Sequence, residues 1–309
     1  MKKTNKKWKR NLKRDWQLYL FLVLPLLYIV IFAYLPMGGL VMAFQDYKPR
    51  LGFLKSEWVG FDNFIKFIQS YNFKNVVGNT LILSLYSIVV TFPLPIIFAL
   101  MINSIRNGKL AKITQTIVNL PHFISVTVLV GIIFQLFNAR TGIYGIAYEA
   151  ITGEYPKDLF ASAANFRHFY VWSAVWQNFG WDSIIYTAAL SSVDTSYHEA
   201  AQIDGATRLQ RVRHIDFPCI IPTVIINLIL RMGSIMSIGF EKVFLLQNSL
   251  NLKTSEIVST YVYQVGLSAS GTSDFSYATA IGCFNSVVNL ILICSVNKIA
   301  SKYSETSLW

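Results

Sequence analysis

Charged residues are scarce in this chain of 309 residues. They make up only 14% of the sequence, whereas hydrophobic residues make up 53%, and the mean hydropathy is +0.44. Soluble globular domains carry about 25% charged residues. The composition therefore excludes an ordinary soluble domain and indicates a chain that lies largely in a membrane. The net charge of +11 does not indicate a nucleic acid partner, because the basic residues are scattered among apolar segments.

Cysteine is also rare, and motifs for catalysis are missing. Cys219, Cys283 and Cys294 lie in or beside apolar segments without C-x-x-C spacing, so we expect buried, unreactive thiols and no metal site. The chain has no GxxxxGK[ST] sequence to hold ATP phosphates, no Ser/His/Asp order and no paired acid site. His122, beside Pro121, is interpreted as a hydrogen-bonded structural residue. We expect a chain that is not an enzyme and binds no cofactor itself.

Six apolar segments are long enough to cross a bilayer, which requires about 20 residues. The first segment follows a strongly basic stretch, and its length without a small-residue cleavage site favours an uncleaved span over a signal peptide. We predict an all-α, polytopic membrane fold. The predicted spans cover about 18–44, 79–102, 113–137, 168–190, 220–246 and 278–296.

The distribution of Lys and Arg predicts the orientation of these spans. Most of the 27 Lys and Arg residues lie in the inner segments if the N-terminus is inside the cell. Because cytoplasmic segments carry the excess of basic residues, both termini and the segment between the fourth and fifth spans are predicted to be cytoplasmic. We expect a basic N-terminus over 1–16, a transmembrane domain over 17–299 and a C-terminal tail over 300–309.

The segment between the first two spans, residues 45–78, is predicted to be external. Within it, GFDNFIKFIQS predicts a short amphipathic helix capped by Asp62, because Phe64, Phe67 and Ile68 repeat at helical spacing. Two placements are equally compatible with this pattern. The helix can lie along the membrane surface or pack on a neighbouring subunit.

A polar and basic stretch between the fourth and fifth spans carries the most specific motif of the chain. The sequence EAAQIDGATRLQRVRHIDFPCIIP begins at Glu199. Ser196 with Glu199, and Thr207 with Gln210, have the spacing of capping boxes. We therefore expect two short helices over 196–222 that are separated by a turn at Gly205. A linker with two well-capped helices is the structural alternative to a docking site.

This stretch resembles the EAA loop of the membrane-spanning subunits of bacterial binding-protein-dependent ABC importers, most closely the permeases for sugars and oligosaccharides. Val212 and Phe217 depart from the Phe and Leu usual in that family, but both remain apolar. The similarity also extends through the six apolar segments. The positions in register with the family pattern are Glu199, Ala200, Ala201, Asp204, Gly205, Ala206, Ile215 and Pro218.

The resemblance implies a permease subunit that a separate ATPase drives. The EAA loop of the family inserts into a groove of a cytoplasmic ATPase dimer, which binds the ATP and Mg. An extracytoplasmic solute-binding protein and a second, similar permease, usually forming a heterodimer, would complete an importer in the bacterial cell membrane, surrounded by lipid. The coupling residues implied here are Glu199, Ala200, Ala201, Asp204, Gly205 and Ala206.

Polar and aromatic side chains within spans four to six are candidates for the solute path. A charge or amide at membrane depth usually faces a water-filled path or a partner, and aromatic rings can stack on sugars. The candidates are Trp176, Asn178, Asp182, Asn227, Arg231 and Asn285. The tryptophans can instead belong to an interfacial aromatic belt. Arg231 can instead form a structural pair with Asp182 or Glu241.

Other functions remain open at this point. An ion-coupled secondary transporter would use Asp182, Arg231 and Glu241 as a relay and would work without ATP. A permease for peptides, amino acids or inorganic anions is also compatible with the EAA loop. The PHFIS and WQNFGW segments resemble those of oligosaccharide permeases, so we expect a saccharide substrate. A membrane scaffold without transport would not require the polar residues within the spans.

Overall fold

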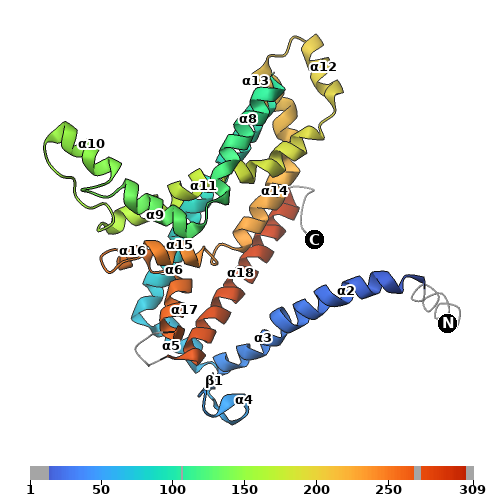
Figure 1. Cartoon of the computed structure of the whole chain (residues 1–309). Coiled ribbons are helices and arrows are strands. Elements are labelled where there is room, and N and C mark those ends of the chain that lie inside the picture. Colours follow the sequence, from blue (N-terminus) through green and yellow to red (C-terminus); the bar gives the residue numbers. More distant parts are fainter. Residues whose placement is uncertain (1–13, 106, 268–272, 304–309) are drawn as a thin grey trace.

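The computed structural model describes residues 14–105, 107–267 and 273–303 (Figure 1). The described residues are almost entirely helical, which confirms the all-α prediction. Within them the strands are β1 (Gln45–Asp46) and β2 (Glu57–Trp58), which pair antiparallel. Most of the predicted basic N-terminus and of the C-terminal tail lies outside the described residues.

Several helical segments are suited to crossing a membrane. Four described segments are long and apolar enough, and they are Trp16–Phe44, Tyr71–Asn103, Arg208–Gly233 and Phe275–Lys302. The pair Gly108–Phe123 and Val126–Leu136, bent by 95°, gives a possible fifth. The predicted fourth span lies in α11 (Ala163–Ser191), whose 29 residues are long enough but less apolar. The count of six spans stays a prediction.

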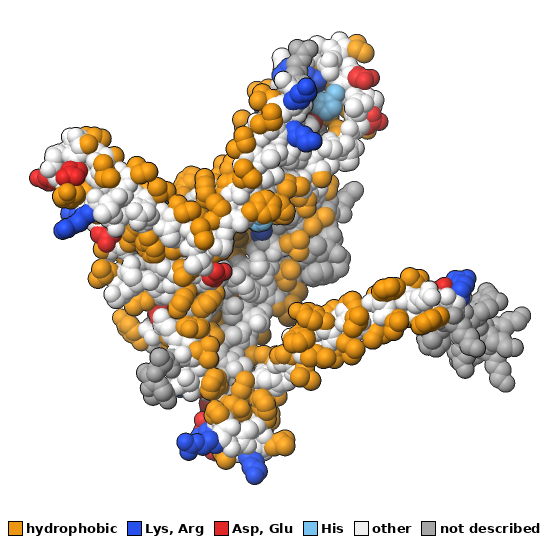
Figure 2. Space-filling model, in the orientation of Figure 1, with side chains coloured by type: hydrophobic (Ala, Val, Ile, Leu, Met, Phe, Trp, Pro, Cys, Tyr) orange, Lys and Arg blue, Asp and Glu red, His pale blue; other side chains and the backbone are white. Residues whose placement is uncertain are grey.

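The first segment extends away from the rest of the chain (Figure 1). It consists of α2 (Trp16–Ile29), the π-helical turn η1 (Val30–Tyr34), α3 (Leu35–Met37) and the 3₁₀ helix η2 (Gly38–Phe44). No residue of α2 is buried, and Figure 2 shows apolar side chains along its whole length. Lipid or another chain must cover this surface, since so large an apolar face is unstable in water.

Each π-helical turn of the described residues ends two residues before a proline. η1 ends before Pro36, and η4 (Val212–Asp216) ends before Pro218. A proline ring collides with the carbonyl four residues earlier, and those carbonyls belong to Phe32 and His214 inside the two turns. Widening the turn relieves this collision, so we attribute both π turns to the prolines.

The second and third predicted spans differ in continuity. α6 (Tyr71–Thr91) and α7 (Pro93–Asn103) together form one apolar segment, which begins eight residues before the predicted start at 79. The third span was predicted to be continuous, and this is wrong. Pro121 interrupts it in η3 (Leu120–Phe123), after α8 (Gly108–Asn119).

A new helix starts directly after this interruption. The hydroxyl of Ser125 accepts a hydrogen bond from the Val128 amide (3.3 Å), which caps the start of α9 (Val126–Leu136). A proline and a capping serine four residues apart therefore turn one apolar run into two helices. α10 (Ile143–Thr152) follows α9, and the two form an arm that projects from the body in Figure 1.

The fifth predicted span, to residue 246, is also interrupted. α14 (Phe217–Gly233) ends at a glycine, and α15 (Phe240–Leu246) starts only after residues 234–239. Side chains of other helices satisfy the freed backbone groups. Asn289 Oδ1 accepts from the Met236 amide (2.9 Å), and the Ser84 hydroxyl donates to the Ile235 carbonyl.

The predicted external segments contain short helices of their own. α5 (Asp62–Gln69) is amphipathic as predicted, but Asp62 is its first residue and forms no cap. Phe67 on α5 is fully buried among aromatic rings of the same chain, so its inner face packs on neither lipid nor another subunit. The partners of Phe67 are Phe73, Tyr261, Tyr277 and Phe284. Other short helices of these segments are α4 (Gly52–Lys55), α16 (Leu252–Ser255) and α17 (Val258–Leu267).

The predicted sixth span lies in α18 (Phe275–Tyr303).

The cysteines are not all buried. Cys219 and Cys294 are exposed on the surface of the chain, and Cys283 is half-buried. The expectation of buried thiols is therefore wrong for the chain by itself. A helix face that contacts lipid or a partner is as apolar in sequence as one that is buried in the chain, so the sequence does not distinguish the two. All three are free.

α11 lies at the centre of the fold and touches α6, α7, α8 and α14. Its contact with α8 depends on Gly180, where a Cβ atom would lie 2.5 Å from the Val118 carbonyl oxygen. Close approach of this kind needs a residue without a side chain. One cluster of the core joins Tyr170 and Val171 of α11 to Leu83 of α6.

Gly180→Ala is expected to lower the free energy of unfolding by about 1–3 kcal/mol, because the backbone of α8 has to move. The measurement is the thermal unfolding of the purified chain in detergent. Gly131→Ala is the matched control, since nothing lies within 4 Å of a methyl group at that position on α9. Equal melting temperatures for the two variants would contradict the close contact.

Candidate functional site

The polar segment after α11 folds as two short helices, as predicted, but its start differs. α12 (Thr195–Ile203) is capped by Asp194, whose Oδ1 accepts from the Ser196 amide (2.9 Å). The predicted capping box of Ser196 with Glu199 is wrong, because an aspartate two residues earlier takes the cap position. The side chain of Glu199 is exposed and makes no hydrogen bond or ion pair to another described residue. Capping therefore does not account for this glutamate.

The hydrogen bond from Ser196 lowers the pKa of Asp194, because it favours the ionised carboxylate. This contribution to helix stability is present above the pKa of the unfolded chain and is lost as the pH falls through the lower folded value. At neutral pH, Asp194→Ala should therefore increase hydrogen exchange in α12. Asp194→Asn keeps an acceptor and should exchange like the wild type. Mass spectrometry of the purified chain measures both, and equal exchange for the two variants would refute the cap.

The predicted turn at Gly205 is confirmed. The Ala206 amide donates to the Ala201 carbonyl (2.8 Å) and the Gly205 amide to the Gln202 carbonyl (3.1 Å). These two bonds form a Schellman motif, which requires a left-handed residue after the C-cap. Gly205 has φ +76°, and Asp204 is the C-cap residue. The Asp-Gly-Ala sequence therefore supplies the C-cap, the left-handed glycine and the amide that end α12.

The second predicted capping box is also confirmed. The Thr207 amide donates to Gln210 Oε1 (2.7 Å), and the Gln210 amide donates to Thr207 Oγ1 (3.4 Å). These bonds start α13 (Arg208–Arg211), which continues through η4 into α14. Both ends of the turn between α12 and α13 are thus fixed by local hydrogen bonds.

The residues of the EAA motif form one surface at an end of the molecule. Figure 1 shows α12 and α13 beyond α8 and α14, while β1 and α4 lie at the opposite end. Tyr197, Ile203 and Leu209 are exposed there, although they are large and apolar. Such residues on a polar segment indicate a protein docking surface. Of the six predicted coupling residues, Ala201 and Ala206 are half-buried and the other four are exposed.

The ion pair of Arg231 is formed with Asp182 rather than with Glu241. One η nitrogen of Arg231 donates to Asp182 Oδ2, and the other donates to Thr91 Oγ1 (3.1 Å). Glu241 instead accepts from Thr127 (3.3 Å). About a third of each paired side chain is exposed. The pair joins α11 to α14, and sequence reasoning missed Thr91 because a threonine in a span carries no signal.

Three of the six candidate path residues line one cavity. Asp182, Asn227 and Arg231 border a volume of about 340 Å³, together with Trp181 and Tyr186. The wall therefore combines two charges, one amide and aromatic rings. Groups of this kind can bind the hydroxyls of a ligand and stack on its apolar face.

Asn178 lies on α11 close to these residues, but its side chain has a different partner. Its Oδ1 lies 3.0 Å from His122 Nδ1, and the His122 ring stacks on Trp181 with the ring centroids 4.3 Å apart. The predicted structural role of His122 is confirmed. Asn285 lies elsewhere, in a groove of about 570 Å³ that also contacts Leu40.

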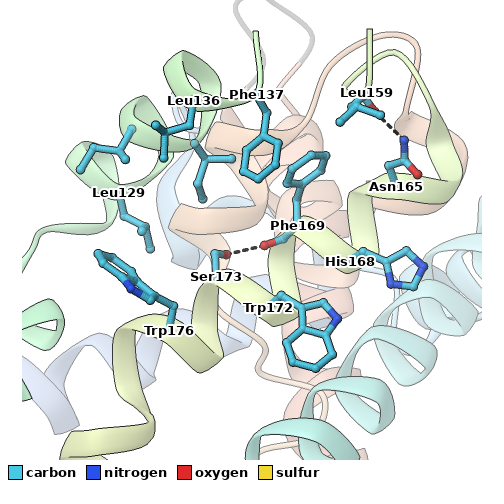
Figure 3. A pocket seen from close by; sticks show the side chains of 12 residues that line it. Leu129, Leu136, Phe137, Leu159, Asn165, His168, Phe169, Trp172, Ser173 and Trp176 are labelled. Atoms are coloured by element: carbon cyan, nitrogen blue, oxygen red, sulfur yellow. Dashed lines mark hydrogen bonds between the residues drawn. The ribbon is translucent and has the colours of Figure 1, made fainter. Parts of the chain in front are cut away.

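Trp176 lines a separate cavity of about 460 Å³ between α9 and α11 (Figure 3). Its wall is mainly apolar, with Leu129, Phe137 and Trp172 facing the space in Figure 3. Ser173 donates to the Phe169 carbonyl within its own helix, so this hydroxyl is not aimed at a ligand. Trp176 and Arg231 line different cavities, so the structure does not bring them together. The place of Trp176 on the path stays a prediction.

Comparison with known proteins adds independent information. Residues 92–305 match the family described as "Binding-protein-dependent transport system inner membrane component". Protein LplB of Bacillus subtilis (strain 168) is 44% identical over 302 residues, which cover 98% of this chain and 94% of that protein. The polygalacturonan/rhamnogalacturonan transport system permease protein YteP of the same strain is 38% identical over 292 residues, which cover 94% and 90%.

A solved structure is similar over nearly its whole length. One chain of a bacterial alginate ABC transporter, in complex with alginate pentasaccharide-bound periplasmic protein, superposes with a TM-score of 0.86 at 37% sequence identity. The superposition covers 97% of this chain and 99% of that chain. The family match over residues 92–305 spans α12, α13 and the residues that line the cavity at Arg231.

Proposed function

Because the chain belongs to the family of binding-protein-dependent transport system inner membrane components, we propose that it forms one wall of the path by which an ABC importer moves an oligosaccharide. As a member of this family it is a multi-pass protein of the bacterial cell membrane and a transport subunit. It is not an enzyme, since ATP hydrolysis belongs to a separate partner. The observation that carries the proposal is the EAA helix and turn, exposed beyond the apolar helices.

The saccharide substrate is supported by two observations. Relatives carry the names of transporters for polygalacturonan, rhamnogalacturonan and alginate, all of which are polysaccharides. The cavity at Asp182, Asn227 and Arg231 offers charges, an amide and a tryptophan, which suit a ligand rich in hydroxyl groups. A peptide substrate has no comparable support.

The ion-coupled transporter is disfavoured by the partners of its supposed relay. Asp182 and Arg231 neutralise each other, and Glu241 is bonded to Thr127 instead of to that pair. A proton or sodium relay would need these groups to communicate. The three residues therefore do not form one pathway for an ion.

We further propose that the coupling residues dock on a cytoplasmic ATPase dimer that binds the ATP and Mg. They form a helix and a turn of fixed shape, which suits insertion into a groove. A second homologous permease, giving a heterodimer, is supported by the uncovered apolar surface of α2. The residues proposed for docking are Glu199, Ala200, Ala201, Asp204, Gly205 and Ala206.

Purification of the tagged chain from native membranes in mild detergent tests this function. We expect an ATPase with a P-loop, a second permease and a solute-binding protein to purify with it. Vesicles that contain the complex should accumulate oligosaccharide only when ATP is present on the ATPase side. Accumulation without ATP, or a chain that purifies alone, would refute the importer.

A further inference from the structure

A buried carboxylate lies directly behind the proposed docking surface. Asp216 is only 3% exposed, and it is the last residue of the π turn η4 before α14. His198 Nε2 lies 3.2 Å from Asp216 Oδ1, which is an ion-pair distance when the imidazole is protonated. Asn103 Nδ2 donates to the same oxygen (3.3 Å). One carboxylate thus joins three helices.

The three helices that meet at Asp216 belong to different regions of the molecule. His198 is the neighbour of Glu199 on α12, the helix proposed to receive the motion of the ATPase. Asn103 is the last residue of α7. α14 begins after Asp216 and carries Arg231 in its last turn, where that side chain reaches Asp182. The carboxylate therefore lies on one covalent and hydrogen-bonded route from the docking surface to the cavity.

Apolar packing does not provide this connection. Neither α12 nor α13 contains a buried residue. Between them and the body lies a hollow of about 680 Å³ with a largely polar wall, to which His198, Arg211 and Asp216 contribute. Among the described residues, the side-chain hydrogen bonds from α12 and α13 to the body come from His198 and from Arg208. The Arg208 Nη1 donates to the Ser104 carbonyl at a long 3.5 Å. Rigid coupling therefore has to run through polar contacts.

The position of Asp216 depends on the proline that follows. Pro218 forces the π turn, and an extra residue in a turn rotates the side chains around it by about 100° relative to an uninterrupted helix. Asp216 is buried and contacts two side chains, His198 and Asn103. Losing either contact would leave the buried charge less well paired, which is strongly unfavourable, so both contacts are held firmly. The sequence His-Ile-Asp-Phe-Pro thus builds a fixed anchor.

We propose that Asp216 is the positioning residue that transmits displacement of α12 to α14. When the ATPase moves α12, the contact with His198 pulls on the start of α14, and Asn103 makes the end of α7 follow. α14 then shifts Arg231 against Asp182 at the cavity. This inference rests on the proposed function as an importer subunit.

The test uses the complete complex in vesicles with its ATPase and binding protein. Three quantities are measured: the ATPase recovered with the chain, ATP hydrolysis, and oligosaccharide taken up per ATP hydrolysed. For Asp216→Ala and for His198→Ala we expect normal ATPase recovery but at least a tenfold loss of uptake per ATP. Asp216→Asn keeps an acceptor for both partners and should restore at least half of the wild-type ratio. Normal uptake per ATP in both alanine variants would overturn the proposal.

Two controls separate transmission from folding. His214→Ala removes another histidine of the same segment, which bonds the Gln210 carbonyl and not Asp216, and should leave all three quantities unchanged. The double variant of Asp216→Ala and His198→Ala should lose no more than the worse single variant, since one contact is removed twice. A loss near 100-fold would show independent effects and overturn the proposal.

The outcomes also separate this inference from the proposed function. Failure of the wild-type complex to take up oligosaccharide with ATP would refute the importer itself. A working wild type whose ratio survives in the variants would refute only the transmission. If Asp216→Ala fails to fold, His198→Ala decides, because that side chain is 24% exposed and its loss is milder.

Discussion

Gly205→Val is expected to cut ATP-driven uptake roughly 30-fold while the chain still reaches the membrane. The left-handed conformation at φ +76° disfavours a β-branched residue by about 2 kcal/mol, and 1.4 kcal/mol corresponds to a factor of ten. Without that conformation the bond from the Ala206 amide to the Ala201 carbonyl is lost, and the end of α12 changes direction. Uptake in cells that lack the native chain, with the membrane level measured by immunoblot, gives the result.

Gly205→Asn is the matched control, because asparagine enters the left-handed region far more readily than valine. Its uptake should stay within about threefold of the wild type. A Cβ atom at this position would meet no other atom within 4 Å, so the first atom of either side chain causes no collision within the chain. Equal uptake by the two variants would show that the conformation of the turn is not what the ATPase recognises.

Breaking the pair of Arg231 and Asp182 is expected to destabilise the chain by about 2–3 kcal/mol in each single variant, Arg231→Met or Asp182→Leu. Arg231→Met leaves the negative charge of Asp182 without its partner, and Asp182→Leu leaves the positive charge of Arg231 without its partner, each in an apolar environment. The value lies below that of a fully buried pair because about a third of each side chain is exposed. Thermal unfolding in detergent measures the loss.

The double variant of Arg231→Met and Asp182→Leu distinguishes two roles of the pair. Stability should return to within about 1 kcal/mol of the wild type, because no uncompensated charge remains. Uptake should stay low, since the cavity has then lost the groups proposed to bind sugar hydroxyls. A double variant that loses the sum of the two single losses would show that the two side chains act independently. Normal uptake would remove the pair from the path.

Local signals in the sequence predicted the coupling segment well. The box of Thr207 with Gln210 and the turn at Gly205 depend on residues only a few positions apart, so their chemistry is complete in the sequence. The spacing of Ser196 and Glu199 also fits a capping box, but Asp194 is the residue that caps α12. Asp194 and Ser196 can both accept a hydrogen bond from the first turn of α12, and the sequence alone does not decide which of them does so.

The interrupted spans show what apolar runs leave out. Apolar residues continue on both sides of Ser125 and of Gly233, so the sequence predicts one span where the chain has two helices. What allows the breaks is distant, since Asn289 satisfies the backbone at Met236. The partner of Arg231 was among the expected alternatives, but choosing Asp182 over Glu241 required knowing where α15 begins.

The absence of buried residues in α12 also bears on the chain before it meets its ATPase. A helix of nine residues without buried side chains is marginal in water, so its cap at Asp194 and the turn at Gly205 are what keep it formed. In an unassembled subunit this segment should open often and offer its backbone to proteases. Degradation of orphan subunits would then begin here, which would match the amount of this chain to that of its ATPase.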